Sequence, residues 1–79
     1  MINPPILYTA AGCTDSRKVR NWLIERGVAF VERNVTGDID AARELLATGA
    51  FGTPLLVVGG KRVIGYQADK LAAEFSGSG

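Results

Sequence analysis

The sequence contains no histidine and only one cysteine, Cys13. The lack of histidine excludes a Cys–His protease dyad, a histidine general base and a histidine-ligated metal site within one chain. A single cysteine cannot form an internal disulfide, so the chain is not a disulfide-stapled secreted scaffold. Because a free thiol persists in a reducing compartment, we expect a cytoplasmic protein.

The sequence also lacks a large excess of charge of one sign, and it has no long apolar run. The formal net charge of +1 gives no field that would attract nucleic acid or anionic lipid, so we expect neither partner. No apolar run approaches the roughly 20 residues of a membrane-spanning helix. The stretch from Met1 to Pro5 lacks the basic and apolar regions of a signal peptide. These absences predict a soluble protein that does not associate with membranes.

The 79 residues, of which 47% are hydrophobic and 22% charged, have the composition of one soluble globular domain. We predict this domain over residues 1–75. The last four residues, Ser76 to Gly79, have the composition of a flexible linker, typical of an added tail or a frayed terminus. A second domain does not fit in this length.

Hydrophobic periodicity predicts seven elements along this domain. Gly27 and Gly49 supply helix stops, and Gly59 and Gly60 supply a hairpin turn. A strand–helix–strand crossover is right-handed, so the first two strands should be parallel, and the hairpin should add two antiparallel strands. The order βαβαββα predicts an α/β fold with a four-stranded mixed sheet flanked by three helices. Strands are expected over residues 6–9, 28–35, 55–58 and 61–65, and helices over residues 13–26, 40–48 and 68–75.

Each predicted helix has one apolar face. Trp22 falls on such a face and is expected in the core rather than as a stacking platform. Asp38 or Asp40 can cap the second helix. The side chains expected to point inward are Val19, Trp22, Leu23 and the stem of Arg26 in the first helix, Ala41, Leu45 and Leu46 in the second, and Leu71 and Phe75 in the third.

Cys13 lies where an apolar strand ends and a charged helix begins. A helix N-terminus presents unpaired N–H groups and the positive end of its dipole, which favour a thiolate over a thiol. Arg17, Lys18 and Arg20 add positive charge nearby. The carboxylate of Asp15 opposes it, so we predict only a partial decrease in the pKa of Cys13. A lone cysteine is more often a small buried hydrophobe, but this position favours a reactive nucleophile.

Three separated stretches form a combined motif. They are Tyr8 to Ser16, which ends in a C-x-x-S sequence, Thr48 to Pro54, and Val63 to Asp69. In order and spacing they resemble the glutaredoxin family of thioredoxin-fold proteins over nearly the whole of residues 5–75. In the family, the first stretch is a strand followed by the active-site loop, the second is the segment before a cis-proline, and the third is a glycine-containing turn before the last helix. The resemblance implies a thioredoxin-like (glutaredoxin) fold and thiol–disulfide oxidoreductase activity.

The resemblance also implies roles for single residues. Cys13 matches the nucleophilic cysteine. Thr53 and Pro54 match a pair joined by a cis peptide bond, whose backbone holds glutathione or a substrate chain in a strand-like pairing. The other positions to which the resemblance gives a role in binding substrate or glutathione are Gly12, Thr14, Arg17, Gly65, Tyr66, Gln67 and Ala68.

The match to the family's glutathione site has two departures. Backbone N–H groups from Gly65 to Ala68 fall where the family grips the γ-glutamyl carboxylate, but Tyr66 replaces the second glycine of the usual pair. Residues 9–11 stand where most glutaredoxins have a lysine just before the active-site loop, and none of them is charged. One charged contact to glutathione is therefore missing unless Arg17 or Lys18 replaces it.

Ser16 decides the predicted mechanism. A second cysteine at this position would attack the mixed disulfide and release the product, but a serine hydroxyl cannot. The resolving thiol must then come from outside, which is a monothiol mechanism. The hydroxyl can still donate a hydrogen bond to the Cys13 thiolate and lower its pKa. The alternatives are an ordinary first-turn residue, or a serine introduced in place of a resolving cysteine to trap a complex.

The leading interpretation is a monomeric oxidoreductase with no bound cofactor. Glutathione or another small thiol is its co-substrate, and proteins that contain disulfides are its substrates. One alternative is a dimeric carrier in which two Cys13 thiolates and two glutathiones hold a 2Fe-2S cluster, with Cys13 as metal ligand. Thr14 and Asp15 depart from the C-G-F-S motif of dedicated carriers.

Two further alternatives keep the fold and change the chemistry. A small reductant of ribonucleotide reductase, recharged by thioredoxin reductase, would suit a weak glutathione site, but the lack of a second cysteine argues against it. Residues 13–35 also resemble the arsenate-reductase-like branch of the thioredoxin fold. That branch has a helical insertion that 79 residues cannot hold.

Overall fold

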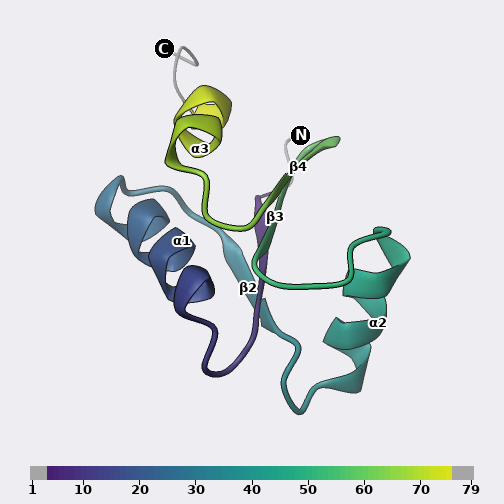
Figure 1. Cartoon of the computed structure of the whole chain (residues 1–79). Helices are drawn as coiled ribbons and strands as arrows, with labels where there is room; N and C mark the ends of the chain where they lie inside the picture. Colours follow the sequence, from purple (N-terminus) through teal and green to yellow (C-terminus); the bar gives the residue numbers. More distant parts are fainter. Residues whose placement is uncertain (1–3, 76–79) are drawn as a thin grey trace.

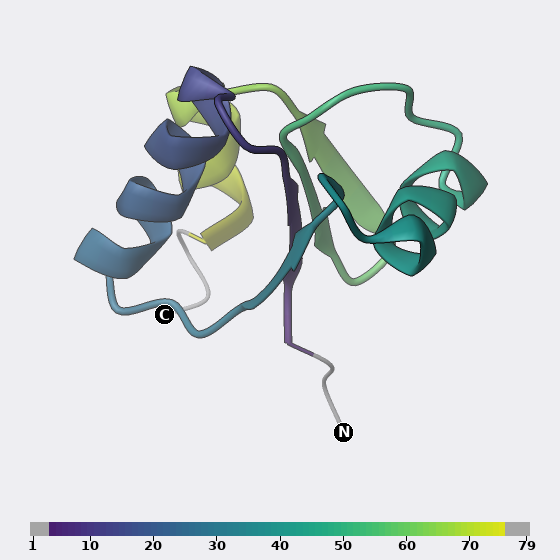
Figure 2. The same cartoon turned by 90° about the horizontal axis from the view of Figure 1, so that it is seen from below.

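The computed structural model describes residues 4–75 and contains one sheet with helices on both of its faces (Figures 1 and 2). The elements are β1 (Ile6–Thr9), α1 (Thr14–Glu25), β2 (Val31–Asn34), α2 (Ile39–Ala47), β3 (Leu55–Val58), β4 (Lys61–Ile64) and α3 (Ala68–Phe75). The predicted order βαβαββα is therefore confirmed. Within residues 4–75, no helix combines the length and the apolar character needed to cross a membrane. The predictions of a missing signal peptide and of a linker-like tail rest on residues 1–3 and 76–79, which lie outside the described residues.

The sheet has the strand order β2-β1-β3-β4, with β1 in its interior. β1 and β2 run parallel, with Tyr8 opposite Arg33. β3 runs antiparallel to β1 and to β4, and Leu56 lies opposite both Leu7 and Val63. The predicted mixed sheet is confirmed. Because β1 is interior, its last three residues are buried.

Alternation along the strands divides the apolar side chains between two cores. Successive residues of a strand point to opposite faces, so Leu7 and Tyr8 enter different cores, as do Leu56 and Leu55. α1 and α3 cover one face of the sheet and α2 covers the other, as Figure 2 shows. The first core contains Leu7, Val19, Trp22, Leu23, Leu56, Val63 and Leu71, and the second contains Tyr8, Leu45, Ala50 and Leu55.

The predicted inward faces of the helices are confirmed with one exception. Trp22 is buried, its ring centroid lies 5.9 Å from that of Phe75, and the Arg26 guanidinium lies 4.0 Å from the centre of the Trp22 ring. The exception is Leu46, whose side chain is 57% exposed. Each helical residue is rotated by about 100° from the one before it. With Leu45 facing the sheet, its neighbour therefore points to solvent.

Two predicted boundaries shift for local reasons. The second strand starts later than predicted, because the Val28 N–H donates to the Leu23 carbonyl oxygen over 3.0 Å and closes the end of α1. The second helix starts one residue earlier, at Ile39. Of the two predicted caps it is Asp38 that acts, and its carboxylate accepts from the Ala41 N–H over 3.0 Å.

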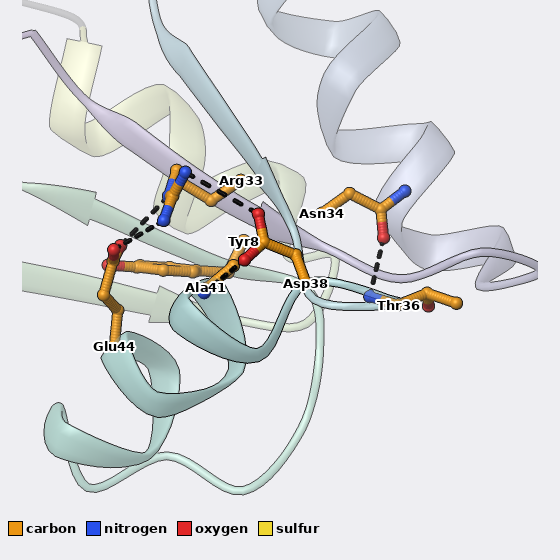
Figure 3. Close-up of polar contacts among 7 residues, drawn as sticks. All are labelled: Tyr8, Arg33, Asn34, Thr36, Asp38, Ala41 and Glu44. Atoms are coloured by element: carbon orange, nitrogen blue, oxygen red, sulfur yellow. Dashed lines mark hydrogen bonds and ion pairs between the residues drawn. The ribbon is translucent and has the colours of Figure 1, made fainter.

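A polar network joins β1, β2 and α2 beside the second core (Figure 3). Arg33 donates from Nε and Nη2 to the two carboxylate oxygens of Glu44, over 3.0 and 2.6 Å. Tyr8 Oη donates to Glu44 over 3.4 Å, and the Asp38 carboxylate lies 3.9 Å from the guanidinium. The hydrogen bonds from Arg33 hold the pKa of Glu44 below its usual value, and burial raises the pKa of Tyr8.

Replacing Glu44 by glutamine is expected to lower the free energy of unfolding slightly, and only above the acid range. The pKa of Glu44 is lower in the folded chain than its ordinary value of about 4.3. The ion pair with Arg33 therefore contributes stability above that value and loses it as pH falls through the lower, folded pKa. Urea unfolding at about pH 7 and about pH 3 measures this difference, which should shrink in acid. Arg43→Gln at the preceding exposed position is the control, and a difference independent of pH would contradict the assignment.

Candidate active site at the N-terminus of α1

Cys13 occupies the N-cap position of α1, so the helix starts one residue later than predicted. Its backbone is extended (φ −84°, ψ 108°), and Gly12 before it has a positive φ of 75°, which lets the chain turn out of β1. The Cys13 N–H donates to the Ala10 carbonyl oxygen over 3.2 Å, and the Cys13 carbonyl oxygen accepts from the Arg17 N–H over 3.3 Å. These contacts hold the half-buried thiol at the helix end where backbone N–H groups are unpaired.

The segment before β3 lies against this thiol. The Thr53–Pro54 peptide bond is cis, as predicted. Cys13 Sγ donates to the Thr53 carbonyl oxygen over 3.7 Å, and Pro54 is fully buried. The fold thus brings together two stretches that lie 40 residues apart in sequence.

Hydrogen bonds lower the pKa of Cys13 from its ordinary value. The largest cause is the Ser16 hydroxyl, followed by the Thr53 side chain and the Ser16 N–H. Burial of the thiol opposes them, and the Asp15 N–H adds a smaller decrease. The predicted direction of the shift is confirmed.

Two of the three cations predicted to lower this pKa, Lys18 and Arg20, have other partners. Lys18 Nζ lies 4.0 Å from the Asp15 carboxylate and 5.8 Å from the centre of the Tyr66 ring. Arg20 donates to Glu32 over 3.4 Å. No cationic side chain is among the causes of the lowered thiol pKa. The predicted effect of the cations was therefore wrong, whereas the predicted effects of the Ser16 hydroxyl and of the backbone N–H groups at the helix start are confirmed.

The Ser16 hydroxyl is buried without a partner. The residue is only 3% exposed, and Oγ makes no hydrogen bond within residues 4–75. An unpaired buried hydroxyl normally destabilises a fold. Ionisation of Cys13 gives this hydroxyl an acceptor, which agrees with its leading part in lowering the pKa. This arrangement favours a role in stabilising the thiolate over that of an ordinary first-turn residue.

Replacing Ser16 by alanine is expected to raise the pKa of Cys13 without lowering stability. The thiolate loses its main hydrogen-bond donor, whereas the fold loses only an unpaired hydroxyl. The rate of alkylation by iodoacetamide against pH should have its midpoint below the roughly 8.5 of a free thiol, and should move upward in the variant. Lys18→Ala removes a cation from the same turn and should leave the midpoint in place. An equal increase in both variants would assign the low pKa to charge.

The glycine-containing turn lies beside Pro54, but its first N–H group is occupied. Gly65 has a positive φ of 73° and donates its N–H to the Pro54 carbonyl oxygen over 2.9 Å. This N–H is therefore not free for the γ-glutamyl carboxylate, contrary to the prediction. Gln67 donates from Nε2 to the Ile64 carbonyl oxygen over 2.6 Å, and its own carbonyl oxygen accepts from the Leu71 N–H. The N–H groups that follow, at the start of α3, have no partner within the helix.

The Glutaredoxin family model matches residues 6–63 of the chain. The chain belongs to the glutaredoxin family. Among solved structures it is similar to the thioredoxin-like protein BC3987, with 31% identity and a TM-score of 0.84 over 89% of this chain and 97% of that one. It is also similar in fold to the glutaredoxin-like protein NrdH-redoxin from Escherichia coli, with 24% identity and a TM-score of 0.80 over 90% and 93% of the two chains. The predicted thioredoxin-like fold is confirmed.

Curated relatives of this glutaredoxin include a regulator. The chain is 39% identical over 54 residues to the global transcriptional regulator Spx of Bacillus subtilis (strain 168). The match covers 65% of this chain and 41% of Spx, so the chain spans less than half the length of that relative. The family and the fold together indicate a thiol redox function.

A cavity of about 220 Å³ adjoins the active-site loop of this glutaredoxin. Its walls include three of the predicted site residues, Gly12, Ser16 and Arg17, and also residues that the sequence analysis missed, Thr9, Glu32 and Asn34. The available signal was topological, because the carboxyl ends of parallel strands meet at one edge of a sheet and often border a ligand. Two other predicted site residues lie at helix starts outside the cavity, with Thr14 opening α1 and Ala68 opening α3.

Proposed function

We propose that this glutaredoxin is a thiol–disulfide oxidoreductase that acts on glutathione mixed disulfides by a monothiol mechanism. The observation that carries the proposal is the contact between Cys13 Sγ and the Thr53 carbonyl oxygen. A substrate chain that pairs with the Thr53 backbone would present its disulfide to the sulfur. The lowered pKa of Cys13 supports its role as nucleophile.

The first step transfers glutathione to the enzyme. The Cys13 thiolate attacks the glutathione sulfur of a protein mixed disulfide. A new S–S bond forms between Cys13 and glutathione as the old S–S bond breaks, and the protein sulfur leaves as a thiolate that takes up a proton. The protein is reduced, and Cys13 is oxidised to the mixed disulfide.

The second step regenerates the enzyme. The thiolate of a second glutathione attacks the sulfur of the bound glutathione, oxidised glutathione leaves, and Cys13 returns to the thiolate. Ser16 has no sulfur, so this external thiol is required. Its hydroxyl stabilises the Cys13 thiolate both as nucleophile and as leaving group, since a thiol of lower pKa leaves faster.

Bound glutathione is proposed to lie between Thr53 and the start of α3. Its cysteinyl part pairs with the Thr53 backbone, close to Gly12 and Thr14. Its γ-glutamyl carboxylate accepts from the N–H groups of Gln67 and Ala68, because a helix N-terminus favours an anion. Tyr66 borders this carboxylate in place of the family's second glycine.

The proposed setting is a monomer in the reducing cytoplasm, where a free thiol persists. Disulfide-containing proteins are its substrates, glutathione or another small thiol is its co-substrate, and nucleic acid and membranes are not partners. A second candidate function is a redox-responsive protein without turnover, which the similarity to the regulator Spx favours.

The intact mass of the chain after incubation with oxidised glutathione tests the proposal. One glutathione should be added at Cys13, none should be added to Cys13→Ser, and reduced glutathione should remove the adduct. Turnover with a glutathionylated peptide separates an enzyme from a redox-responsive protein, which would form the adduct and stop.

A parallel anaerobic reconstitution with iron and sulfide tests the alternative of a cluster carrier. A brown dimer would favour a carrier of a 2Fe-2S cluster held by Cys13 and glutathione. Recharging by thioredoxin reductase in place of glutathione would favour the small ribonucleotide-reductase reductant. If Cys13 forms neither the adduct nor a cluster, the redox function fails.

A further inference from the structure

The loop between β1 and α1 is held from outside by one side chain. The Ala11 N–H donates to Thr36 Oγ1 over 2.9 Å, across 25 positions of the sequence. Ala11 lies two residues before Cys13, and Thr36 lies between β2 and α2. Within residues 4–75, this is the one hydrogen bond that ties the loop residues 10–12 to a distant part of the chain. The orientation of the loop therefore depends on Thr36.

Thr36 itself has a fixed position. Its N–H donates to Asn34 Oδ1 over 2.8 Å (Figure 3). A side-chain acceptor of this kind fixes the backbone two residues further along the chain. The Val35 N–H donates to the Thr9 carbonyl oxygen over 2.8 Å, so the pairing of β1 with β2 continues beyond the end of β2. The Thr36 hydroxyl is thus placed with respect to the end of β1, where the loop begins.

The loop is a tight turn over residues 10–13. The Cys13 N–H donates to the Ala10 carbonyl oxygen over 3.2 Å, and the φ of 75° at Gly12 is that of the third residue of a type II turn. The N–H of the second residue, Ala11, takes no part in closing such a turn and needs an acceptor from elsewhere. Thr36 supplies this acceptor. One hydrogen bond therefore closes the turn at Cys13, and another anchors the turn to the β2–α2 connection.

The placement of this turn matters for the thiol. The chain enters Cys13 directly from the turn, and Sγ has to meet the Thr53 carbonyl oxygen, which lies 3.7 Å away. A rotation of the turn would move the sulfur relative to Thr53, and a displacement of about 1 Å can slow a reaction by about a hundredfold. Ala11 and Thr36 are both exposed, so water can replace their contact and the contact adds little to stability. Its consequence is therefore for the position of the sulfur.

We infer that Thr36 is a positioning residue for Cys13. It acts on the sulfur through the Ala11 N–H and the turn of residues 10–13. The inference rests on the proposed function for its effect on disulfide exchange. It extends the site to the connection between β2 and α2, which supplies no atom to the reaction.

Two substitutions at Thr36 test the inference. Thr36→Val keeps the branched shape and removes the acceptor, whereas Thr36→Ser keeps the hydroxyl. The rate constant for formation of the adduct with oxidised glutathione should fall about fivefold in Thr36→Val, as for the loss of one hydrogen bond of ordinary net strength. Thr36→Ser should react like the parent chain, and both variants should keep the urea midpoint of the parent chain. An unchanged rate in Thr36→Val, or an equal fall in Thr36→Ser, would overturn the inference.

Asp38→Ala is the matched control for a general loosening of the β2–α2 connection. Asp38 lies two residues after Thr36 and caps α2 by accepting from the Ala41 N–H. Loss of this cap should lower the urea midpoint and leave the rate of adduct formation unchanged, which is the opposite of the pattern for Thr36→Val. A fall in rate equal to that of Thr36→Val would assign the effect to loosening and overturn the inference.

A double variant tests the order of the contacts. Asn34→Ala removes the acceptor for the Thr36 N–H and should lower the rate to a smaller extent than Thr36→Val. The variant that carries both substitutions should react as fast as Thr36→Val alone, because Asn34 acts through Thr36. Losses that multiply would contradict this order of contacts.

Alkylation by iodoacetamide separates the inference from the proposed function, because it requires no disulfide exchange. The Thr53 side chain is the second largest cause of the lowered pKa of Cys13. A displaced sulfur should therefore show a higher pH midpoint of alkylation in Thr36→Val than in the parent chain or in Thr36→Ser. The increase should be smaller than in Ser16→Ala, since Ser16 lies at the same helix start and keeps its hydrogen bond.

The two readouts fail separately. If the parent chain forms no adduct with glutathione, the proposed function fails, but a higher midpoint in Thr36→Val that Thr36→Ser restores would still support the positioning role. A midpoint that Thr36→Val leaves unchanged would overturn this role, even where the reaction with disulfides is slowed.

Discussion

Replacing Ser16 by cysteine is expected to shorten the lifetime of a glutathione adduct on Cys13 by at least about a hundredfold, since a group held in place reacts as if at high concentration. Ser16 lies three positions after Cys13, and its hydroxyl is the main hydrogen-bonding partner of the thiolate. Side chains at this spacing at a helix start fall within the usual Cα separation of a disulfide, roughly 4.4–6.8 Å. The introduced thiolate attacks Cys13 Sγ, the S–S bond to glutathione breaks, and glutathione leaves.

Intact mass after rapid mixing with oxidised glutathione measures this change. The parent chain should retain the added glutathione until a thiol is supplied, whereas the variant should lose it and end two hydrogens lighter as an internal disulfide. Asn21→Cys is the control, because position 21 is eight residues along the helix, a rise of about 12 Å from Cys13. A persistent adduct in Ser16→Cys would mean that the side chain of residue 16 does not reach the sulfur.

Replacing Leu23 by alanine is expected to cost about 2–5 kcal/mol of the free energy of unfolding, as for other buried leucines. Leu23 is 0% exposed and belongs to the first core, between α1 and the sheet. A chain of this length has a total stability of roughly 4–12 kcal/mol. The variant should therefore unfold at a much lower urea concentration and be partly unfolded at 37 °C.

The adjacent residue gives a matched control for this loss. Ile24 is on the same helix and is 59% exposed, so Ile24→Ala removes a similar number of carbon atoms from the surface. Its unfolding midpoint should change little, because an exposed apolar side chain gains little from folding. A similar loss in both variants would show that burial of the side chain does not determine the cost at these positions.

The order of elements and the sheet could be predicted because several local signals agree along the chain. Apolar runs, helix stops and the Gly59–Gly60 turn all indicate the same boundaries, and the crossover rule then fixes the parallel pair. Errors arose where one residue serves two elements. Val28 continues an apolar run in the sequence, but its N–H closes α1, so the strand starts later.

The candidate site could be predicted only as far as backbone position decides it. The setting of Cys13 at a helix start and its approach to Thr53 follow from chain order and from the family resemblance. The directions in which long side chains point do not follow from chain order or from the resemblance. Lys18 and Arg20 were expected to act on the thiol, but each turns to a partner outside the sequence neighbourhood, at Tyr66 and Glu32.

The sequence also did not show which hydrogen-bonding groups near the site are already paired within the fold. The Gly65 N–H was expected to bind a ligand, yet it pairs with the Pro54 carbonyl oxygen. The unpaired state of the Ser16 hydroxyl could not be predicted either, because it depends on burial by residues distant in sequence. In both cases the sequence indicates which groups are near, and only the packed chain decides which of them are already satisfied.

The interior strand β1 links the two halves of the molecule mechanically. Leu7 enters one core and its neighbour Tyr8 the other, so neither core can open without disturbing the same four-residue strand. The amide hydrogens of β1 should therefore be the last to exchange with solvent, and only through global unfolding. Cys13 follows directly from this strand by a short loop. Its geometry should accordingly persist through the local fluctuations of the exposed edges and disappear only when the whole chain unfolds.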